Sequence, residues 1–483
     1  MDEESIPSSW TWVELGEVAE SVRNGIYVSR PGATPDGVPI LRIGAVRPMR
    51  LDLSDLRYTG MDATEVKERD GMLTPGDLLF TRYNGNPEFV GACARVPDGA
   101  GGLTYPDKLI RVRLVPGLFD SRFVSYAWAS ESVRRQVRKF VKTSAGQVGI
   151  AGGSLKKVRL PLPPLAEQHR IVEALEEQLS RLEAAVANLD AGQRRAQQLG
   201  TAALTTSLDK VGGVPSRRLG DLLKEPLRNG HSAKATTDPA GIRTLNLTAV
   251  TKGEFSNDNT KLTVADPHRV RDLWLTRGDI LVQRSNTPEL VGTTAMYDGS
   301  DGWAIFPDLL IRVRVNDDVL SEYVTLILQS RRGRSYFKSR AKGLAGSMPK
   351  IDQSTIENFT IPVPPLEVQE RVVAEVRYEM DRVARVSLEL HRARRRSVGL
   401  RNALLRTAFN GKLVPQDLSD EAAHVALARV AAERAGQSKA KRPRKTAPKE
   451  LTKAPAPRAA EASSPAPEPT SAPVLAVQQE FDL

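Results

Sequence analysis

Apolar and polar positions follow two different rhythms along this chain, and each rhythm occurs twice. Residues 109–115 and 310–315 are short β-rich runs in which apolar and basic side chains alternate, bounded by Gly, Pro and Asp turns. Residues 165–208 and 366–409 instead place apolar side chains at spacings of three and four, as a long amphipathic helix does. The pattern predicts two α+β globular segments, each followed by a long helix.

The chain also repeats its own sequence with an offset of 201 to 205 residues, which marks two domain-sized copies rather than a solenoid. The matches occur in one order: Leu73-Thr-Pro-Gly-Asp-Leu-Leu-Phe80 with Leu275-Thr-Arg-Gly-Asp-Ile-Leu-Val282, Tyr105–Arg113 with Phe306–Arg314, and Leu160-Pro-Leu-Pro-Pro-Leu165 with Ile361-Pro-Val-Pro-Pro-Leu366. A set of matches in this order predicts two globular domains of similar fold. Each domain also carries a helix near 121–140 or 319–338.

The Pro-x-Pro-Pro segments mark where each long helix starts, because proline lacks the backbone N–H and restricts the residue before it. Each helix is about 44 residues long, or roughly 65 Å at 1.5 Å per residue. Their 4-3-4-3 apolar spacing is that of a coiled-coil seam. The seam residues that we predict to bind a partner helix or protein are Leu175, Leu179, Leu182, Val376, Met380 and Val383.

Charge predicts how the two helices pair. Residues 165–208 carry six acidic and four basic side chains, whereas residues 366–409 carry six acidic and ten basic ones. An antiparallel pairing with level ends brings Arg194 and Arg195 near Glu379 and Asp381. It also brings four glutamates of the first helix near the Arg392–Arg401 cluster: Glu173, Glu176, Glu177 and Glu183. A parallel pairing would oppose arginines, so we predict antiparallel helices and a pseudo-two-fold arrangement of the domains.

These observations divide the chain into six segments. They are a first globular domain (1–164), a first coiled-coil helix (165–209), a second globular domain (210–365), a second coiled-coil helix (366–412), a turn and short helix (413–436, the helix at about 419–435 capped by Ser419 or Asp420), and a basic Pro/Ala-rich tail predicted to be disordered (437–483).

Composition narrows the class of protein. No apolar run approaches the ~18 residues of a membrane span, and the N-terminus lacks the apolar region of a secretory signal. The chain has one cysteine, Cys93, which excludes a disulfide framework or a Cys-rich zinc site and which we expect to be buried and inert. We therefore expect a soluble cytoplasmic protein. Its 69 basic and 58 acidic residues give a net charge of +11, which favours a nucleic-acid partner.

Catalytic motifs are missing from the sequence. It contains no Walker-type loop, dinucleotide-binding glycine motif or His-Glu-x-x-His zinc motif. The Pro-Asp pairs at 106–107 and 307–308 lack the further acidic residue and lysine of a nuclease site, and Asn86-Pro87-Glu88-Phe89 matches an aminomethyltransferase motif only in part. We predict no catalytic residue, cofactor or metal site.

Two domains at a fixed separation suit a ligand with two half-sites, and DNA is the obvious one. Candidate contacts are polar and basic loop residues at equivalent places in both copies, because Arg can read guanine and Asn adenine. In the first copy they are Arg82, Tyr83, Asn84, Asn86, Lys142 and Gln147, and in the second Arg284, Ser285, Asn286, Lys342 and Ser347. A solvated Gly-rich turn is the plainer interpretation of each loop.

Taken together, these motifs resemble the specificity subunit of type I restriction-modification systems. The likeness covers about residues 10–435 and is carried by Leu160–Val172 and Ile361–Val373, with their Pro-x-Pro-Pro-Leu and Arg-Ile/Val-Val elements, and by Ala408–Pro415. The resemblance implies that each globular domain reads one half of a bipartite double-stranded DNA target. It also implies that the coiled coil sets the unread spacer.

The resemblance further implies a subunit without an active site, which binds two methyltransferase subunits that modify adenine and, through the assembly, two ATP-dependent restriction subunits. The alternative is a non-catalytic adaptor whose coiled coil binds proteins. A methyltransferase with built-in recognition domains is a third option, which the missing cofactor motifs disfavour. The tail is not covered by the likeness.

Overall fold

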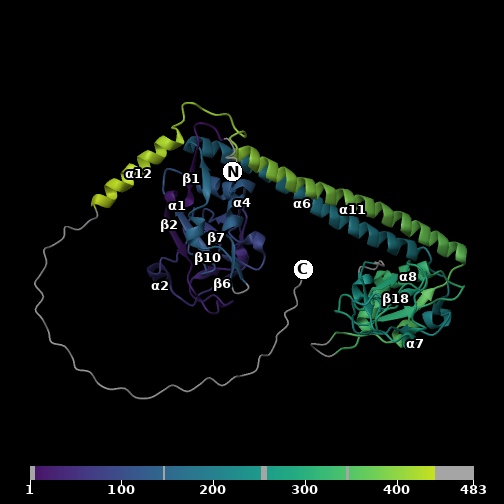
Figure 1. Ribbon diagram of the computed structural model, residues 1–483. Coiled ribbons are helices and arrows are strands. Elements are labelled where there is room, and N and C mark those ends of the chain that lie inside the picture. Colours follow the sequence, from purple (N-terminus) through teal and green to yellow (C-terminus); the bar gives the residue numbers. More distant parts are fainter. Residues whose placement is uncertain (1–5, 145–146, 252–257, 344–347, 441–483) are drawn as a thin grey trace, which may run out of the picture. The chain divides into compact units, whose positions relative to one another are not determined.

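The computed structural model describes residues 6–144, 147–251, 258–343 and 348–440 (Figure 1). The chain divides into two units, Met1–Leu427 and Ala428–Leu483. The first unit holds both globular domains and the two long helices, α6 (Leu165–Asp209) and α11 (Leu366–Phe409). The predicted α+β fold with two antiparallel long helices is confirmed. Of the predicted disordered tail, 441–483 lie outside the described residues, and the remainder belongs to a helix.

The first domain is built on an antiparallel four-stranded sheet of order β2-β10-β7-β9. Its elements are β1 (Thr11–Glu14), α1 (Leu15–Val18), β2 (Ala19–Asn24), β3 (Pro39–Leu41), η1 (Ile43–Ala45), β4 (Val46–Arg47), β5 (Arg50–Leu51), β6 (Leu56–Tyr58), α2 (Ala63–Glu68), β7 (Leu78–Thr81), β8 (Tyr83–Asn84), η2 (Pro87–Phe89), β9 (Cys93–Arg95), β10 (Leu109–Leu114), α3 (Ser121–Ala129), α4 (Glu131–Phe140), β11 (Lys142–Ser144), β12 (Gln147–Gly149), α5 (Gly152–Leu155) and β13 (Arg159–Leu162).

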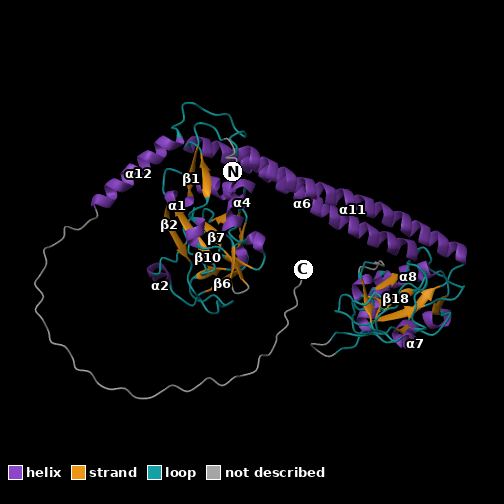
Figure 2. Ribbon diagram, in the orientation of Figure 1, coloured by secondary structure: helices purple, strands orange, loops and turns teal. Residues whose placement is uncertain are grey.

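The second domain repeats this sheet, in the order β15-β20-β18-β19 (Figure 2). Its elements are β14 (Ser216–Arg218), η3 (Leu219–Leu222), β15 (Arg228–Asn229), β16 (Ile242–Leu245), η4 (Leu247–Ala249), β17 (Thr260–Thr263), α7 (Pro267–Val270), β18 (Ile280–Gln283), β19 (Thr294–Met296), β20 (Leu310–Val313), α8 (Ser321–Gln329), α9 (Arg331–Arg340), α10 (Gln353–Glu357) and β21 (Thr360–Pro362).

The helix predicted near 121–140 is two helices, α3 and α4, and that predicted near 319–338 is α8 and α9. A serine with extended backbone separates each pair: ψ is 149° at Ser130 and 162° at Ser330. Ser330 also caps the next helix, because its hydroxyl accepts a hydrogen bond from the backbone N–H of Gly333. A residue that caps a new helix cannot continue the previous one.

The repeated Gly-Asp and Arg-Val-Arg motifs form an ion pair with each other in both domains. Asp77 and Asp279 are buried, and each carboxylate accepts hydrogen bonds from an arginine on the neighbouring strand, Arg113 at 2.8 Å and Arg314 at 2.5 Å. A buried carboxylate needs such a partner, because an unpaired charge is costly to desolvate. These repeated polar motifs therefore serve the scaffold of each domain.

A buried glutamine fixes each domain to the start of its own long helix. Gln168 donates from Nε2 to the carbonyl oxygens of Leu118 (2.8 Å) and Pro163 (3.1 Å), and its Oε1 accepts from the N–H of Asp120 (2.9 Å). Gln369 makes the equivalent three bonds to Asp318, Pro364 and Leu320. Each of these glutamines lies three residues after the leucine of the Pro-x-Pro-Pro-Leu motif, which is the first residue of its helix.

The two long helices run side by side in opposite directions (Figure 1). Along the pair, the residue number on α6 falls as that on α11 rises, in the ion pairs Lys210–Glu375 (2.8 Å), Asp190–Arg394 and Glu183–Arg401 (3.6 Å) and in the hydrogen bond between Gln193 and Ser387 (3.2 Å). Of the contacts predicted for four glutamates of α6, that of Glu183 is thus present, whereas Glu176 instead pairs with Arg122 of the first domain at 3.4 Å.

The predicted contacts of Arg194 and Arg195 with Glu379 and Asp381 are displaced. Gln193 faces Ser387, and Glu379 instead pairs with Arg382 of its own helix at 2.9 Å. The prediction assumed that the helix ends lie level, but the first turns of each helix extend beyond the end of its partner. The first turns of each helix are buried against its own domain, as Val372 and Val373 are in the core of the second.

Each domain also touches the end of the other long helix. The ring of Phe409, the last residue of α11, lies 5.3 Å from that of Phe123 in the first domain. Leu204 of α6 belongs to the core of the second domain. Because each domain holds both helices, its position along the pair is set by packing at two points.

The segment after α11 returns to the first domain. Gln416 bonds Glu167, and Asp420 pairs with Arg170 at 2.7 Å. The predicted helix at 419–435 begins later, as α12 (Ala423–Ala440), because the side chains of the two predicted caps are engaged: Asp420 with Arg170, and Ser419 with Asp417 at 2.7 Å.

Candidate nucleic-acid interface

Two candidate loops of the first domain, separate in sequence, form one small sheet. Strand β12 pairs with β11 on one side and with β8 on the other, so Val148 lies opposite Asn84, and Gly149 opposite Tyr83. Gly149 is required there, because a Cβ would lie 2.4 Å from the ring of Tyr83. Arg82, Asn84, Lys142 and Gln147 therefore belong to one structural unit, which we call the first ribbon (β8, β11 and β12).

The second domain has an equivalent arrangement. Lys350 bridges to Ser285 on one side and to Lys342 on the other, and these bridges define the second ribbon. The backbone N–H of Ile351 donates to the carbonyl oxygen of Arg284 at 2.9 Å, as that of Ile150 does to Arg82. Both domains thus build the same ribbon from the same two loops.

Several predicted residues of the first ribbon have side chains available to a ligand. Lys142, Gln147 and Asn86 are exposed, and Arg82, Tyr83 and Asn84 are half-buried. The guanidinium of Arg82 lies over the ring of Tyr83, 4.8 Å from its centroid, which holds it extended. The Oδ1 atoms of Asn84 and Asn86 accept from backbone N–H groups two residues ahead, at 2.9 Å and 3.0 Å. Both side chains are therefore oriented by their own loop.

The second ribbon differs from the first in how the corresponding side chains are exposed and bonded. Ser285 is 1% exposed, so it lies beneath the surface rather than on it. Asn286 is engaged at both ends, because its Nδ2 donates to Gln283 Oε1 at 2.9 Å and its Oδ1 accepts from the N–H of Thr287 at 2.8 Å. Arg284 is half-buried. These positions match the first domain in sequence, but Ser285 and Asn286 serve the loop itself.

Lysines carry the exposed positive charge of the second ribbon. Lys342 is 84% exposed and lies 3.5 Å from Asp352, whose carboxylate also accepts hydrogen bonds from Thr355 and Ser354 that hold its pKa well below its usual range. Lys350 is exposed beside Lys342 and was missed by the sequence analysis, because no motif marks it. Ser347 lies outside the described residues.

The seam residues predicted to bind a partner are largely covered by this chain. Leu175, Leu179 and Val376 are buried, while Leu182 and Val383 are half-buried between the helices. Met380 is 37% exposed. Their role toward a second protein stays a prediction, and Leu182 and Val383 also line grooves on the surface of the pair.

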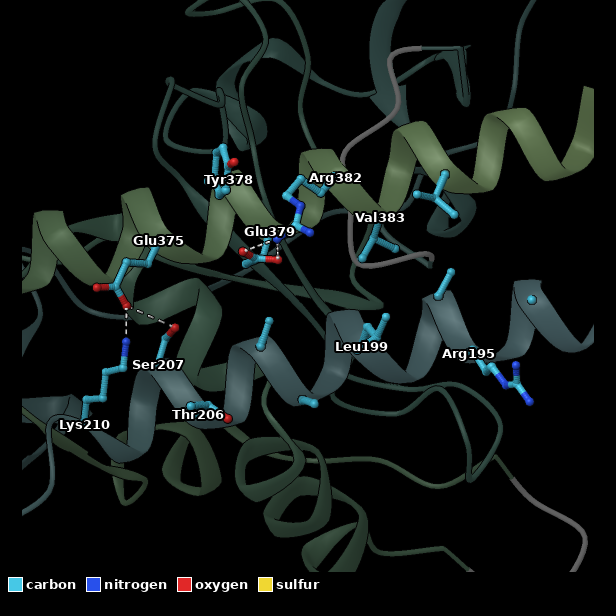
Figure 3. Close-up of a pocket in the computed structure, with 15 residues that line it drawn as sticks. Arg195, Leu199, Thr206, Ser207, Lys210, Glu375, Tyr378, Glu379, Arg382 and Val383 are labelled. Carbon is cyan, nitrogen blue, oxygen red and sulfur yellow. Dashed lines mark hydrogen bonds and ion pairs between the residues drawn. The ribbon is translucent and has the colours of Figure 1, made fainter.

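Apolar side chains with exposed surface line two grooves along the helix pair. One groove, of about 610 Å³, includes Leu199, Tyr378, Val383 and Val386 and is flanked by the Lys210–Glu375 ion pair (Figure 3). A second, of about 520 Å³, is lined at the corresponding positions of the repeat by Leu400, Leu182 and Ala185. We call them the helix grooves. Arg195 and Arg396, and Ala202 and Ala403, also correspond.

Metal sites and membrane spans both require particular residue types in one place. Within the described ranges, no group of three or more His, Cys, Asp or Glu side chains could hold a metal ion. In the same ranges, no helix is long and apolar enough to cross a bilayer. Cys93 is buried, as expected, and burial raises the pKa of its thiol.

Comparison with known protein families gives a match over two segments of the chain. The model of the type I restriction modification DNA specificity domain matches residues 124–188 and 217–377. The first segment spans the end of one globular domain and the first half of its long helix, and the second spans most of the other domain with the start of its helix. They include both Pro-x-Pro-Pro motifs.

Two curated relatives are specificity subunits of type I restriction enzymes. The EcoKI subunit of Escherichia coli (strain K12) is 39% identical over 161 residues, which is 33% of this chain and 34% of that protein. The StySPI subunit of Salmonella potsdam is 24% identical over 439 residues, covering 86% of this chain and 92% of that protein. A solved structure concerned with complex assembly and conformational transition of the type I R-M system has a TM-score of 0.66 at 18% identity, and covers 84% of this chain and 99% of that one.

Proposed function

We propose that this chain is a member of the type I restriction modification DNA specificity family and that it recognises a bipartite double-stranded DNA sequence. Each globular domain reads one half of the target with its ribbon and the loop beside it. The antiparallel helix pair sets the number of unread base pairs between the halves. The chain acts in the cytoplasm, with access to cellular DNA.

One observation supports this function best. Two domains of the same architecture sit on an antiparallel helix pair, and each carries a ribbon with exposed lysines and polar loop residues at equivalent positions. Lysine side chains bind phosphates regardless of sequence, whereas oriented Asn and Arg side chains read base edges. A two-fold arrangement of reading elements matches a target with two half-sites. The ribbons differ in detail, so the two half-sites differ in sequence.

The helix grooves supply a surface for partner proteins. Because seven lining positions of the first groove have counterparts in the second, each groove can bind one copy of the same partner. The partner is a methyltransferase subunit that modifies adenine, present twice, and two ATP-dependent restriction subunits join through it. The specificity chain itself contributes recognition and leaves both reactions to its partners.

The test is methylome sequencing in a host that lacks other adenine methyltransferases. The full chain is expressed with the methyltransferase and restriction genes that neighbour its own, and methylated motifs are read with and without this chain. We expect a bipartite adenine motif that disappears when this gene is removed, and co-purification of the methyltransferase. An unchanged methylome together with no co-purifying methyltransferase would instead support the adaptor.

A further inference from the structure

A buried arginine holds the far end of the DNA-facing loop in the first domain. Arg134 of α4 is 8% exposed and donates from Nη1 to the carbonyl oxygens of Val90 (3.2 Å) and Gly91 (3.0 Å). Its Nη2 donates to the carbonyl oxygen of Glu88 at 2.8 Å. These carbonyls follow Asn86 directly, where the loop turns back into the sheet.

The second domain repeats this contact with its own arginine. Arg334 of α9 donates from Nη1 to the carbonyl oxygen of Val291 at 3.3 Å and from Nη2 to that of Glu289. The loops differ in their exposed side chains, but both are held at the same backbone positions. The contact therefore belongs to the shared design of the two domains rather than to either loop sequence.

A glycine next to each arginine brings the loop close to the same helix. Gly91 and Gly292 have positive φ, 66° and 74°, a conformation that glycine adopts without strain. A Cβ at Gly91 would lie 2.7 Å from Val137, and one at Gly292 would lie 2.4 Å from Phe337. The segment in which each loop re-enters the sheet is thus packed closely against α4 or α9.

Arg134 is buried and Arg334 is half-buried, and arginines in such places usually have an acidic partner. Among the described residues, neither Arg134 nor Arg334 makes an ion pair, and burial lowers the pKa of both guanidinium groups. A charge held in the interior only by carbonyl dipoles is costly, but an apolar residue in its place would leave these carbonyl oxygens without a donor. The planar guanidinium adds what an apolar residue lacks, which is a fork that fixes several carbonyls at once.

We propose that Arg134 and Arg334 are positioning residues for DNA reading, each fixing the path of the loop that faces one half-site. This inference rests on the proposed function. In the first domain the loop carries Asn84 and Asn86, so a loop that shifts moves both amides away from the base edges. Neither arginine needs to touch DNA for this role.

The test uses Arg134→Lys and Arg334→Lys, each in the full complex in the same methylation-deficient host. Lysine keeps the charge, but its single nitrogen cannot hold the carbonyls in a fork. Matched controls are Arg135→Lys and Arg331→Lys, which alter exposed arginines of the same helices. Methylome sequencing compares methylation of the wild-type motif with methylation of sites that carry one changed base in either half.

We expect Arg134→Lys to reduce discrimination in one half of the motif by about tenfold, the value of one lost charge-assisted hydrogen bond, and to leave the other half unchanged. Arg334→Lys should affect only the opposite half, and the controls neither. Unchanged discrimination in both halves, or an equal loss in both, overturns the inference. If the wild-type complex writes no bipartite motif, the proposed function itself fails, which is a distinguishable result.

Discussion

The two globular domains differ in their ribbons far more than in their attachments to the helix pair. Gln168 and Gln369 make the same three buried hydrogen bonds, and Asp77 and Asp279 pair with equivalent arginines. In the ribbons, by contrast, the amide of Asn84 accepts a hydrogen bond from its own loop, whereas that of its counterpart in the repeat, Asn286, is tied to its loop at both ends.

This difference separates two kinds of repeated residue. Side chains that hold a domain in place keep their partners in both copies, because the backbone they bind is the same. Side chains that face outward are free to differ, because each copy meets its own half of the target. Repetition in sequence thus indicates architecture more directly than it indicates a binding residue.

The largest expected effect comes from breaking a shared attachment. Gln168→Leu or Gln369→Leu leaves two carbonyls and one N–H without their buried partner, which costs about 3 kcal/mol of stability in that domain. Hydrogen exchange measured separately for each domain should show faster exchange only in the altered domain. Gln178→Leu, at an exposed position of α6, is the control. Equal exchange in all three variants would contradict the role of the attachment.

A smaller effect is expected from removing one asparagine side chain from each ribbon loop. Asn86→Ala should weaken binding of the target duplex by about 1–3 kcal/mol, the value of an amide that reads a base, and should cost only about 0.5 kcal/mol of stability through the lost hydrogen bond from the Glu88 N–H. Asn286→Ala should instead lower the stability of the second domain by about 1 kcal/mol, because Gln283 loses its partner. DNA titration and thermal unfolding of both variants measure the contrast. It fails if the two substitutions behave alike.

The first domain has a pH-dependent contact that the second does not repeat. Glu167 is buried between Trp10 and Gln416, and burial raises the pKa of its carboxyl above 4.5. The folded state therefore binds this proton more tightly than the unfolded state. The resulting stability is present below the unfolded pKa and is lost as pH rises through the raised one.

Glu167→Gln removes that titration, so the stability difference between wild type and variant should change with pH just above 4.5 and be level at higher pH. Thermal unfolding of both proteins from pH 4 to pH 8, with Glu173→Gln as an exposed control, measures it. A difference that does not vary with pH would show that Glu167 titrates alike in both states.

The smallest expected effect comes from two equivalent ion pairs between domain and helix, in which the acidic and basic side chains have exchanged places. In the first domain Arg122 meets Glu176 of α6 at 3.4 Å, and in the second Glu322 meets Arg377 of α11 at 2.8 Å. Glu322→Arg should cost about 0.5 kcal/mol, as expected for an exposed pair, and adding Arg377→Glu should restore it. A double-mutant cycle measures this coupling. A cycle with no coupling would mean that the polarity is incidental.

Much of the fold could be predicted from the sequence. The internal repeat, the Pro-x-Pro-Pro stops and the apolar spacing are local patterns, and they led to two α+β domains on two antiparallel helices. The register of the helices could not be predicted, because it depends on how the first turns pack against the domains. The breaks at Ser130 and Ser330 depend on backbone geometry that serine does not dictate.

The candidate site was predictable only in outline. Loop position and residue type selected both loops of each ribbon, but no local pattern shows that β12 pairs with β8. Ser285 has the composition of a surface residue, yet it is buried by a partner strand that is distant in sequence. Arg134 stands in a basic helix whose arginines look alike, and only the folded chain distinguishes it from its exposed neighbour Arg135.

The central claim is that the helix pair holds two reading domains at a fixed separation. The most direct test inserts one seven-residue repeat into each helix, after Leu189 and after Leu390, which keeps the apolar seam in register. Each insertion adds about 10 Å, the length of about three base pairs of DNA. Methylome sequencing should then find the same two half-sites with a spacer about three base pairs longer. An unchanged spacer, written by a complex that assembles and methylates normally, would contradict the account.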